Sequence, residues 1–416
     1  MPGTTSPAPS CTAIVVGGGP GGLMAAEVLA TAGLNVTLVE HMPSVGRKFL
    51  LAGRSGLNLT HSEPLERMVP RYGDAAPRLD AALRAFDAGA LREWSAGLGE
   101  PTFIGTSGRV FPTSLRGAPL LRAWLRRLDE LGVRALTRTR WTGWSPDGAL
   151  LVRDRDGTQQ TLASDVVVFA LGGASWPRVG SDGGWVARFR DAGIEVHDLR
   201  PANCGVRIAW SDDFIERHAG APLKNVALRV GDVVVRGDAV ITATGMEGGP
   251  VYGVSAAVRA AVDRDGVASM LVDLHPDLDV PQVATRLGRR RPKDSVSTTL
   301  KRTLGLSPAA VAVLREPSVG RLPTSPDHLA AHLKAVPVRV DDVMPIDRAI
   351  SSAGGVALDE VDDAFMLRRR PGTYVVGEML DWEAPTGGYL LQATFATAVT
   401  AARAAVDRLA ADRLLR

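Results

Sequence analysis

The chain has 416 residues, of which 45% are hydrophobic and 22% are charged. This balance is typical of a soluble globular protein with two or three domains, and it excludes a mostly disordered chain. Its 45 glycines and 27 prolines follow no short period, which excludes collagen-like and low-complexity sequence. The net charge of +3 arises from 48 basic and 45 acidic residues, and it is weak evidence for nucleic-acid binding.

The first fifty residues predict one strand–helix–strand unit. Thr12–Val16 is a short apolar run that is followed by glycines, and Asn35–Val39 is a second apolar run. Between them, Leu23–Ala32 is rich in helix-forming residues, and Gly33 ends the pattern. Together they have the length of one βαβ unit. A glycine-rich, basic stretch, Gly46–Thr60, follows.

The remainder of the chain predicts an α/β region, then a β-rich region, and finally a return to α/β. Short alternating strands begin after about Cys204, a polar helical region follows, and a buried strand precedes a long Ala-rich helix that starts at about Gly388. The predicted helical ranges are Pro77–Gly97, Ala118–Leu131 and Val283–Lys334. The predicted strands are Val133–Trp144 and Leu150–Leu162 around a Pro146–Gly148 turn, Asp165–Ala170, Val206–Ala209, Val226–Val230, Val233–Val235, Ala239–Thr242 and Tyr374–Val376.

The two cysteines, Cys11 and Cys204, lie far apart in the sequence. This separation argues against a dithiol redox centre, a disulfide framework and a cysteine-based zinc site. The apolar run Cys11–Val16 is too short for a signal-peptide core, and no run of 18 apolar residues occurs. We therefore expect a cytoplasmic protein that does not span a membrane.

The first predicted strand leads into a glycine motif that is typical of dinucleotide binding. Gly17, Gly19 and Gly22 have the spacing G-x-G-x-x-G, which permits a tight turn, a close approach to a pyrophosphate and close packing of helix on strand. The following helix would direct unpaired N–H groups at a phosphate. Glu40, at the end of the second strand, is placed to accept a hydrogen bond from a ribose 2′-hydroxyl. The alternative is a glycine turn in an unrelated α/β protein.

The other end of the chain favours FAD over NAD as the bound dinucleotide. Pro371–Glu378 reads as a turn, a strand and a Gly-Glu pair, and Pro385–Gln392 opens the last helix. Gly387 and Gly388 would expose N–H groups at that helix start, which suits the N1–C2=O edge of a reduced flavin. Glu378 would bind the ribityl chain. Alone, the segment reads equally well as a glycine turn before a core helix.

These motifs together resemble a family of bacterial NAD(P)/FAD-dependent oxidoreductases that includes aminoacetone oxidase and the 3-dehydro-bile-acid reductases. The resemblance runs from Ile14 to about Ala405, and its most specific stretch is residues 377–389. It implies FAD as cofactor and an α/β fold: a Rossmann-type, glutathione-reductase-like FAD domain with an inserted β-rich domain and a small helical subdomain. We expect the FAD domain over 1–200 and 351–416, the β-rich domain over 201–275 and 336–350, and the helical insertion over 276–335.

One segment departs from the family pattern. Many relatives carry Gly-Gly-Gly-Arg-Cys-Asn-Leu-Thr where this chain has Gly-Arg-Ser-Gly-Leu-Asn-Leu-Thr at residues 53–60. The Arg-Cys pair is replaced by Gly56 and Leu57, and an arginine stands earlier, at Arg54. Since the resemblance places this segment near the flavin ring, the substrates of characterised members are not transferred to this chain.

Further cofactor residues are predicted from local chemistry and from the resemblance. Arg47 and Lys48 would neutralise the pyrophosphate or hold the adenosine, with a solvated basic loop as the alternative. Small residues after the strand at 165–170 resemble a second FAD contact, with a strand-exit turn as the alternative. The full predicted set is Gly17, Gly19, Pro20, Gly21, Gly22, Glu40, His41, Gly46, Arg47, Lys48, Gly53, Asn58, Thr139, Trp141, Ala170, Gly172, Gly173, Trp176, Gly377, Glu378, Thr386, Gly387, Gly388, Tyr389, Leu390 and Gln392.

The catalytic side chain is not identified by the sequence, and Arg54, Arg109 and Tyr252 are weak candidates. Arg109 would bind a carboxylate or carbonyl, or serve as a structural hydrogen-bond donor. His328 and His332 have i, i+4 spacing, but they lack the adjacent Glu and a third ligand, so we expect no metal site. The basic runs Arg289–Lys293 and Arg368–Arg370 have no interleaved aromatics, so we expect solvated loops and no nucleic-acid contact.

These observations predict an FAD-dependent oxidoreductase that transfers hydride between flavin N5 and a small organic substrate. NAD(P)H is a candidate transient reductant, although no second dinucleotide motif is present. One alternative is an oxidase that transfers electrons from an amine or alcohol to oxygen. Another, from a different class, is an RNA-acting flavoprotein or a nucleotide-binding sensor without turnover. The sequence leaves the oligomeric state open.

Overall fold

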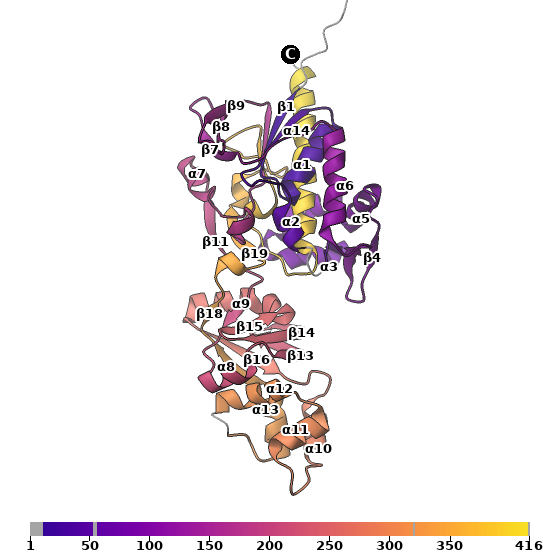
Figure 1. Cartoon of the computed structure of the whole chain (residues 1–416), viewed down its shortest axis with the longest axis vertical. Coiled ribbons are helices and arrows are strands. Elements are labelled where there is room, and N and C mark those ends of the chain that lie inside the picture. Colours follow the sequence, from indigo (N-terminus) through magenta and orange to yellow (C-terminus); the bar gives the residue numbers. More distant parts are fainter. Residues whose placement is uncertain (1–10, 53–55, 319–320, 415–416) are drawn as a thin grey trace, which may run out of the picture. The chain divides into compact units, whose positions relative to one another are not determined.

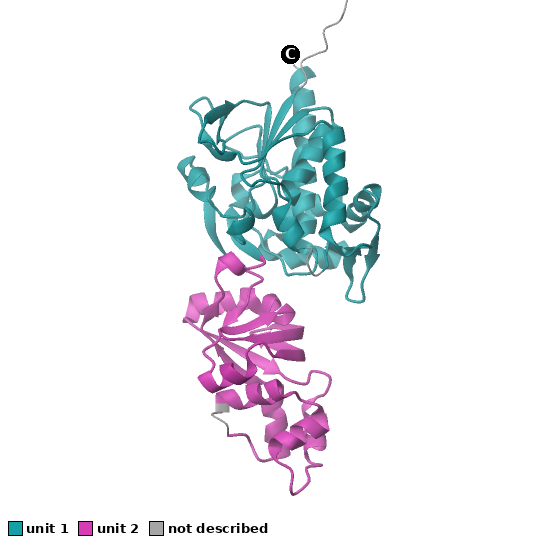
Figure 2. Cartoon of the chain, viewed as in Figure 1, with its two compact units in different colours: residues 1–200, 351–416 teal, residues 201–350 magenta. Residues whose placement is uncertain are grey.

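The protein is described here by a computed structural model, which covers residues 11–52, 56–318 and 321–414. The chain divides into two compact units, residues 1–200 with 351–416 and residues 201–350 (Figure 2). The predicted site residues Gly53 and Arg54 lie outside the described residues. Among the described residues, no helix is long and apolar enough to cross a membrane.

The first unit is built on a parallel five-stranded sheet with strand order β20-β10-β1-β2-β6. Most of its strands are short and largely apolar because they are buried within the unit, whereas the edge strand β6 is mostly exposed. The strands are β1 (Thr12–Val16), β2 (Asn35–Val39), β6 (Arg134–Leu136), β10 (Val166–Phe169) and β20 (Thr373–Val375).

Three helices pack side by side in this unit: α1 (Pro20–Thr31), α6 (Gly117–Glu130) and α14 (Tyr389–Leu414) (Figure 1). α1 also contacts β1 and β2, and it is buried nearly all round, so it consists of small and apolar residues. α14 presents a series of buried alanines to α1, which allows the two helices to approach closely. Residues from the two ends of the chain therefore share one core.

The rest of the first unit consists of small sheets and short helices around this core. Three further sheets have the orders β3-β5-β4, β7-β8-β9 and β11-β19. The elements are α2 (Arg47–Ala52), β3 (Thr60–His61), α3 (Leu65–Met68), η1 (Val69–Ala75), α4 (Ala76–Ala85), α5 (Ala88–Gly97), β4 (Thr102–Ile104), β5 (Arg109–Pro112), β7 (Arg140–Trp144), β8 (Leu150–Arg153), β9 (Gln159–Leu162), η2 (Pro177–Val179), α7 (Val186–Asp191), β11 (Val196–Ala202), β19 (Ser351–Val356), η5 (Leu358–Glu360) and η6 (Gly377–Met379).

The second unit is an antiparallel seven-stranded sheet with order β17-β16-β13-β14-β15-β12-β18. α9 (Gly249–Asp265) packs on it closely, since a Cβ on Gly253 would lie 2.9 Å from the side chain of Val235. The strands are β12 (Val206–Arg207), β13 (Pro222–Val230), β14 (Val233–Thr242), β15 (Gly245–Gly248), β16 (Ala268–Asp273), β17 (Val336–Val340) and β18 (Asp342–Val343). The other helices are α8 (Asp212–His218), α10 (Val280–Leu287), α11 (Val296–Leu304), α12 (Pro308–Arg315), η3 (Glu316–Ser318), α13 (Pro326–Lys334) and η4 (Ile346–Arg348).

The predicted fold class is confirmed: a Rossmann-type α/β unit carries an antiparallel β-rich insertion. Several predicted elements were wrong in extent. The helix predicted over Pro77–Gly97 is two helices, because the Asp87 side chain accepts a hydrogen bond from the amide of Ala90 and starts α5 there. The strand predicted over Val133–Trp144 is also two strands: β6 joins the parallel sheet, and only β7 pairs with β8.

In the second unit, the predicted strands Val233–Val235 and Ala239–Thr242 are one ten-residue strand, β14. Arg236 and Asp238 between them point to the exposed face of the same strand, so the intervening polar residues do not mark a turn. α9 has no counterpart among the predicted elements. Its valines are spread among alanines, so its apolar residues show little helical periodicity. The sequence pattern therefore does not indicate this helix.

Candidate functional site

The glycine motif forms a tight loop at the carboxyl end of β1. Gly17 has φ +110°, its amide donates to the carbonyl of Val39 at 2.8 Å, and a Cβ on it would lie 2.3 Å from the carbonyl oxygen of Ala170. A Cβ on Gly22 would lie 1.8 Å from the carbonyl oxygen of Gly17. By contrast, nothing lies within 4 Å of a Cβ placed on Gly19. The loop is therefore packed tightly against the sheet on one side and open on the other.

The open side of this loop is the N-terminus of α1. Gly19 is the N-cap and provides no side chain to accept from the first helical amides, and Pro20 occupies the first turn. The first amides of a helix have no partner within the helix, and they carry its partial positive charge. The space beside Gly19 thus suits an anion such as a diphosphate, which requires a backbone without a Cβ at that point.

Glu40 fixes this loop to the end of β2. Its Oε2 accepts from the amide of Gly18 at 2.8 Å, and its Oε1 accepts from the amide of Met42 at 2.7 Å. The Nδ1 of His41 lies 3.2 Å from Oε1. A carboxylate has about four acceptor positions, so the two backbone bonds leave room for a ribose hydroxyl to donate.

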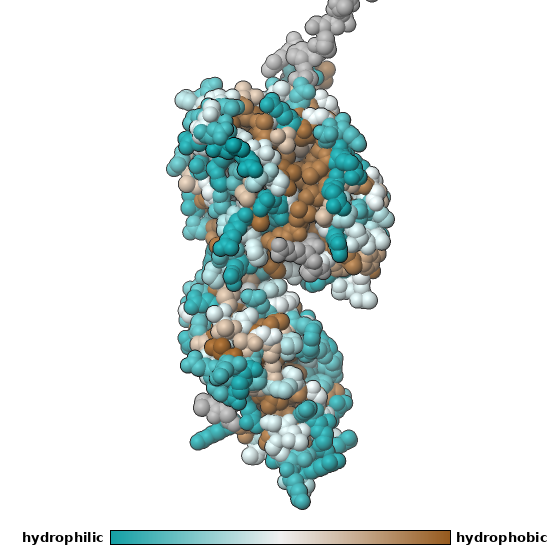
Figure 3. Space-filling view, viewed as in Figure 1, coloured by the Kyte–Doolittle hydropathy of each residue, from teal (hydrophilic) through white to brown (hydrophobic). Residues whose placement is uncertain are grey.

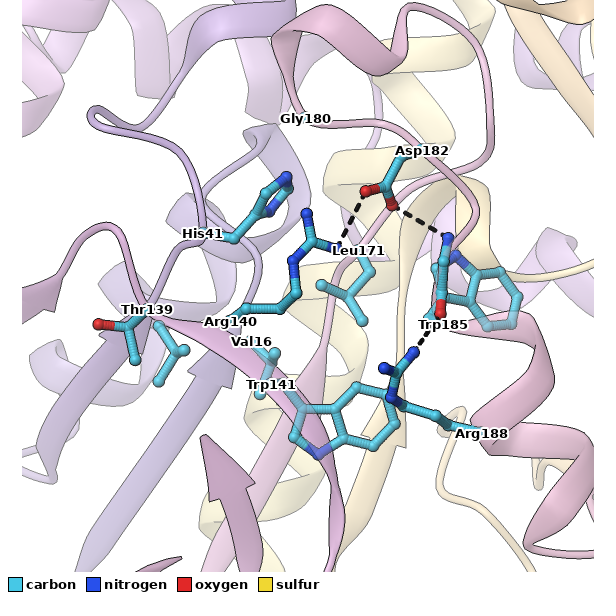
Figure 4. Close-up of a pocket in the computed structure, with 12 residues that line it drawn as sticks. Val16, His41, Thr139, Arg140, Trp141, Leu171, Gly180, Asp182, Trp185 and Arg188 are labelled. Atoms are coloured by element: carbon cyan, nitrogen blue, oxygen red, sulfur yellow. Dashed lines mark hydrogen bonds and ion pairs between the residues drawn. The ribbon is translucent and has the colours of Figure 1, made fainter. Parts of the chain in front are cut away.

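A pocket lies at the carboxyl ends of β1 and β2 and contains about 400 Å³ of empty space, part of it open to solvent (Figure 4). Three of the predicted cofactor-binding residues, His41, Thr139 and Trp141, line it. In an open α/β sheet, ligands bind outside the carboxyl ends of the strands. The full lining is Val16, Val39, His41, Thr139, Arg140, Trp141, Leu171, Gly180, Asp182, Gly184, Trp185 and Arg188.

The pocket also contains an ion pair and a fixed arginine that the sequence analysis did not identify. Arg140 Nη1 lies 3.0 Å from Asp182 Oδ2 (Figure 4), and Arg188 Nε donates to the carbonyl of Thr142 at 2.8 Å. Burial acts to raise the pKa of Asp182, but the Gly184 amide and the Arg140 guanidinium outweigh it and hold the pKa below its ordinary value. Asp182 is therefore ionised at neutral pH.

The start of α14 meets the glycine loop. A Cβ on Gly21 would lie 3.2 Å from the side chain of Thr394, two residues beyond the predicted contact residue Gln392. At the helix start, Gly388 has φ +103° and lies against Thr60, since a Cβ there would be 2.4 Å from the Thr60 backbone. The predicted loop and the predicted helix start are thus brought into one site.

Polar groups gather around the start of α14. Thr60 Oγ1 donates to Gln392 Oε1 at 2.6 Å, and Gln392 Nε2 donates to the carbonyl of Phe86 at 2.6 Å. Arg109 Nε lies 4.0 Å from a Cβ placed on Gly387. The predicted residues Thr386, Tyr389 and Leu390 flank this point in sequence, and the carbonyl of Tyr389 accepts from the buried Tyr72 hydroxyl at 2.8 Å.

Three predicted residues retain buried polar atoms without a partner among the described residues: Asn58 at Oδ1, Arg47 at Nε and Trp141 at Nε1. A buried polar atom without a hydrogen bond is costly in a folded protein, unless a bound molecule or water supplies one. Gly46, beside Arg47, has φ +71° and packs against Leu121, so it positions the start of α2. These three unpartnered atoms fit a site completed by a polar ligand.

Lys48 and Glu378, predicted to contact different parts of the cofactor, pair with each other. Lys48 Nζ lies 2.7 Å from Glu378 Oε2 and donates to Ser175 Oγ at 2.6 Å. Glu378 Oε1 accepts from the amide of Ser352 at 2.9 Å, and its Oε2 accepts from the amide of Gly173 at 3.4 Å. This network joins α2, the exit of β10, β19 and η6.

The exit of β10 lies next to the glycine loop, as the closeness of Gly17 to Ala170 shows. Gly172 has φ +69°, and its carbonyl accepts from Trp185 Nε1 at 2.8 Å. Gly377, which has φ +67°, lies against Thr394 on α14. Trp176 adopts a left-handed conformation at φ +62°, which is uncommon for a bulky residue.

The remaining catalytic candidate, Tyr252, lies on α9 of the second unit, whereas the residues of this site belong to the first unit. Burial raises the pKa of its hydroxyl. No group of three or more His, Cys, Asp or Glu that could hold a metal ion occurs within the described parts of the chain. His332, on α13, hydrogen-bonds through Nε2 with the carbonyl of Leu314 at 3.0 Å.

Comparisons with known proteins agree with this architecture. Residues 11–404 match the model of a family described as the HI0933-like protein Rossmann domain. The chain is 27% identical over 409 residues to the 3-dehydro-bile acid delta(4,6)-reductase of Clostridium scindens, covering 95% of this chain and 98% of that protein.

Among solved structures, the chain is similar in fold to the 3-ketosteroid delta1-dehydrogenase from Sterolibacterium denitrificans, with a TM-score of 0.54 and 14% identity over 96% of this chain and all of that one. A flavocytochrome c3 fumarate reductase gives a TM-score of 0.53 and 15% identity over 97% of this chain and 79% of that one. At these identities the likeness concerns the fold alone.

Proposed function

Because the chain belongs to the HI0933-like family, we propose that it is an FAD-dependent oxidoreductase that transfers hydride between flavin N5 and a small organic substrate. The family predicted from the motifs is confirmed, and so is the expectation of a flavoprotein oxidoreductase at the level of that family. The observation that carries the proposal is the meeting of the open glycine loop with the start of α14, through Gly21 and Thr394.

The residues present fit FAD along its whole length. Gly17–Gly22 and the amides of α1 would hold the diphosphate, and Glu40 the adenosine ribose. The pocket around Thr139 and Trp141 would hold the adenine. At the other end, residues 387–392 would face the pyrimidine edge of the ring. When bound, FAD supplies an isoalloxazine ring whose N5 accepts or donates hydride.

The chain's own groups would set the charge at the pyrimidine edge. The first amides of α14 carry the positive end of a 26-residue helix, and Gly387 and Gly388 leave them uncovered by side chains. Negative charge that develops at this edge is therefore stabilised by fixed dipoles. Gln392 is held by Thr60 and Phe86, so the first turn is rigid.

The Lys48–Glu378 pair would orient the ribityl chain. Glu378 is held by two backbone amides as well as by Lys48, and its remaining lone pairs can accept from ribityl hydroxyls. The positive charge of Lys48 and the negative charge of Glu378 cancel, so the pair adds little net charge beside a diphosphate. Ser175 fixes the position of the lysine.

Arg109 is the residue that we propose to contact the substrate. It is exposed on β5 with its Nε 4.0 Å from a Cβ placed on Gly387, and its side chain makes no hydrogen bond or ion pair with the described residues. A guanidinium binds a carbonyl or carboxylate oxygen through two parallel hydrogen bonds. Arg109 would therefore hold and polarise a carbonyl substrate next to the flavin site.

For the direction of transfer, we propose reduction of a conjugated carbonyl compound with NAD(P)H as the hydride source. NAD(P)H becomes NAD(P)⁺, the substrate C=C bond gains the hydride, and a proton from the protein or from water completes the product. The Clostridium scindens relative is a reductase by name, which supports this direction. The alternative is an oxidase that takes hydride from an amine or alcohol and transfers the electrons to oxygen.

The proposal is tested by reconstituting the purified chain with FAD and mixing it anaerobically with NADH or NADPH. We expect a yellow protein whose visible absorption bleaches with a nicotinamide and returns when an enone acceptor is added. Absorption that bleaches only with an amine or alcohol, and returns with oxygen, identifies the oxidase. A protein that remains colourless after reconstitution contradicts the proposal.

The role of Arg109 is tested by Arg109→Met, with Arg122→Met as the matched control on the exposed face of α6. Loss of one charge-assisted contact of about 1.5–3 kcal/mol predicts a roughly 10- to 150-fold fall in kcat/KM. FAD content should be unchanged in both variants. Equal turnover by the two variants would remove Arg109 from the substrate site.

A further inference from the structure

A second hollow adjoins the pocket of Figure 4 and shares His41, Arg140 and Arg188 with it. It is a wide groove with about 910 Å³ of empty space, part of it open to solvent. Five arginines line it, namely Arg138, Arg140, Arg153, Arg155 and Arg188, together with a single acidic residue, Asp154. The surface over β7 and β8, which contribute to the groove, is mostly hydrophilic (Figure 3).

The positive charge of this groove is only partly compensated within the protein. Asp154 Oδ1 accepts from the amides of Asp156 and Thr158, both at 2.9 Å, so this carboxylate is used to form a turn. Arg138 and Arg153 are exposed, and their side chains form no hydrogen bond or ion pair with the described residues. Arg155 pairs only with the neighbouring Asp156, at 3.2 Å in solvent, where an ion pair contributes little.

Other groove arginines are held in fixed positions. Arg140 is fixed by Asp182, and Arg188 by the carbonyls of Thr142 and Gly184. The backbone of Arg138 has φ +54°, and its amide donates to the carbonyl of Met42 at 3.0 Å. A non-glycine residue in this left-handed conformation is uncommon. The groove therefore keeps like charges close together before any ligand arrives.

We infer that this groove binds a compact phosphate-bearing anion, a di- or triphosphate, next to the adenosine end of the dinucleotide site. Guanidinium groups bind phosphate through paired hydrogen bonds, and several of them around one hollow suit clustered negative charges. An extended nucleic-acid strand is favoured less, because the groove lining has no Trp, Tyr or Phe on which bases would stack.

The test is isothermal titration of the FAD-loaded full chain with sodium tripolyphosphate in metal-free buffer. This probe has no base or sugar, so a nucleoside pocket does not contribute to its binding. The variant is Arg138→Gln combined with Arg153→Gln, since neither side chain lines the adenosine pocket. The matched control is Arg122→Gln with Arg126→Gln, two exposed arginines of α6 that lie outside the groove lining.

We expect saturable binding by the unaltered chain, at least tenfold weaker binding by the groove variant, and a change of less than twofold in the control. Arg153→Lys, which retains the charge but not the paired donors, should fall between them. FAD content, equal in all variants, reports that they fold. If the chain does not bind FAD, the same titration is made on the chain without FAD, so a failure of the flavin proposal and a failure of this inference are distinguishable.

Four results would overturn the inference: no saturation with tripolyphosphate, equal weakening in the control, binding only before FAD is added, or tighter binding of a 20-nucleotide RNA than of tripolyphosphate. Equal weakening would mean that net charge alone attracts the anion. Binding lost on addition of FAD would assign the groove to the dinucleotide site. Tighter RNA binding would assign it to nucleic acid.

Discussion

Gly19→Ala separates the role of the glycine loop in the fold from its role in binding. Gly19 has φ −80° and ψ −178°, which alanine adopts without strain, and a Cβ there has nothing within 4 Å. Alanine removes unfolded-state entropy, which favours folding by about 0.4–1 kcal/mol, but it is a poorer N-cap than glycine by a similar amount. The free energy of unfolding of the apoprotein should therefore change by less than about 1 kcal/mol.

The effect on FAD should be much larger. If the diphosphate occupies the open space, the new methyl group prevents its approach to the first amides of α1. Two charge-assisted hydrogen bonds of about 1.5–3 kcal/mol each are then weakened or lost. That loss of about 3–6 kcal/mol corresponds to a roughly 150- to 20,000-fold rise in Kd.

The assay is titration of apoprotein with FAD, followed by flavin fluorescence, together with thermal melting of each apoprotein. Gly249→Ala is the matched control, because Gly249 opens α9 and also has nothing within 4 Å of its Cβ. A Gly19→Ala chain that binds FAD as tightly as the unaltered chain would refute the placement of the diphosphate. A chain that has lost its cooperative melt would refute the claim that this side of the loop is open.

Three further substitutions test the packing around the site. Gly388→Ala should destabilise the chain by at least about 2 kcal/mol, as measured by urea unfolding, because its Cβ would lie 2.4 Å from the Thr60 backbone at φ +103°. Tyr72→Phe should cost about 1–3 kcal/mol in the same assay, since it leaves the buried carbonyl of Tyr389 without its donor. Asp182→Asn should be less stable than the unaltered chain at neutral pH. Since the folded pKa of Asp182 lies below its ordinary value of 3.8, that difference should be present above about pH 4 and disappear as the pH falls through the folded pKa, in unfolding curves taken at several pH values.

The parts of the site that the sequence predicted are those with a local signal. The glycine loop, the acidic residue at the end of β2 and the glycines before α14 each lie within a few residues of the strand or helix that they serve. Backbone requirements such as φ +110° at Gly17 leave a mark on residue type. The sequence therefore locates both the loop around Gly17 and the start of α14.

The features that were missed depend on contacts between distant residues. Arg140 and Asp182 are 42 positions apart, and Lys48 and Glu378 are 330 apart, so neither pair forms a motif. Charged residues of these types are also common on solvated surfaces, which gives them no compositional signal. Arg188 belongs to the same group, because only the fold brings its guanidinium to the pocket.

The order in which the elements leave the ribosome has a consequence for how this protein matures. β10 obtains its outer neighbour, β20, only after about 200 further residues have been translated. At typical rates of synthesis that interval lasts roughly 10–40 seconds. Until then β10 is an unprotected apolar edge, the kind of surface to which chaperones or other nascent chains attach. Cells that make this protein in quantity should depend on holding factors during that interval, and codon changes that lengthen it should lower the soluble yield.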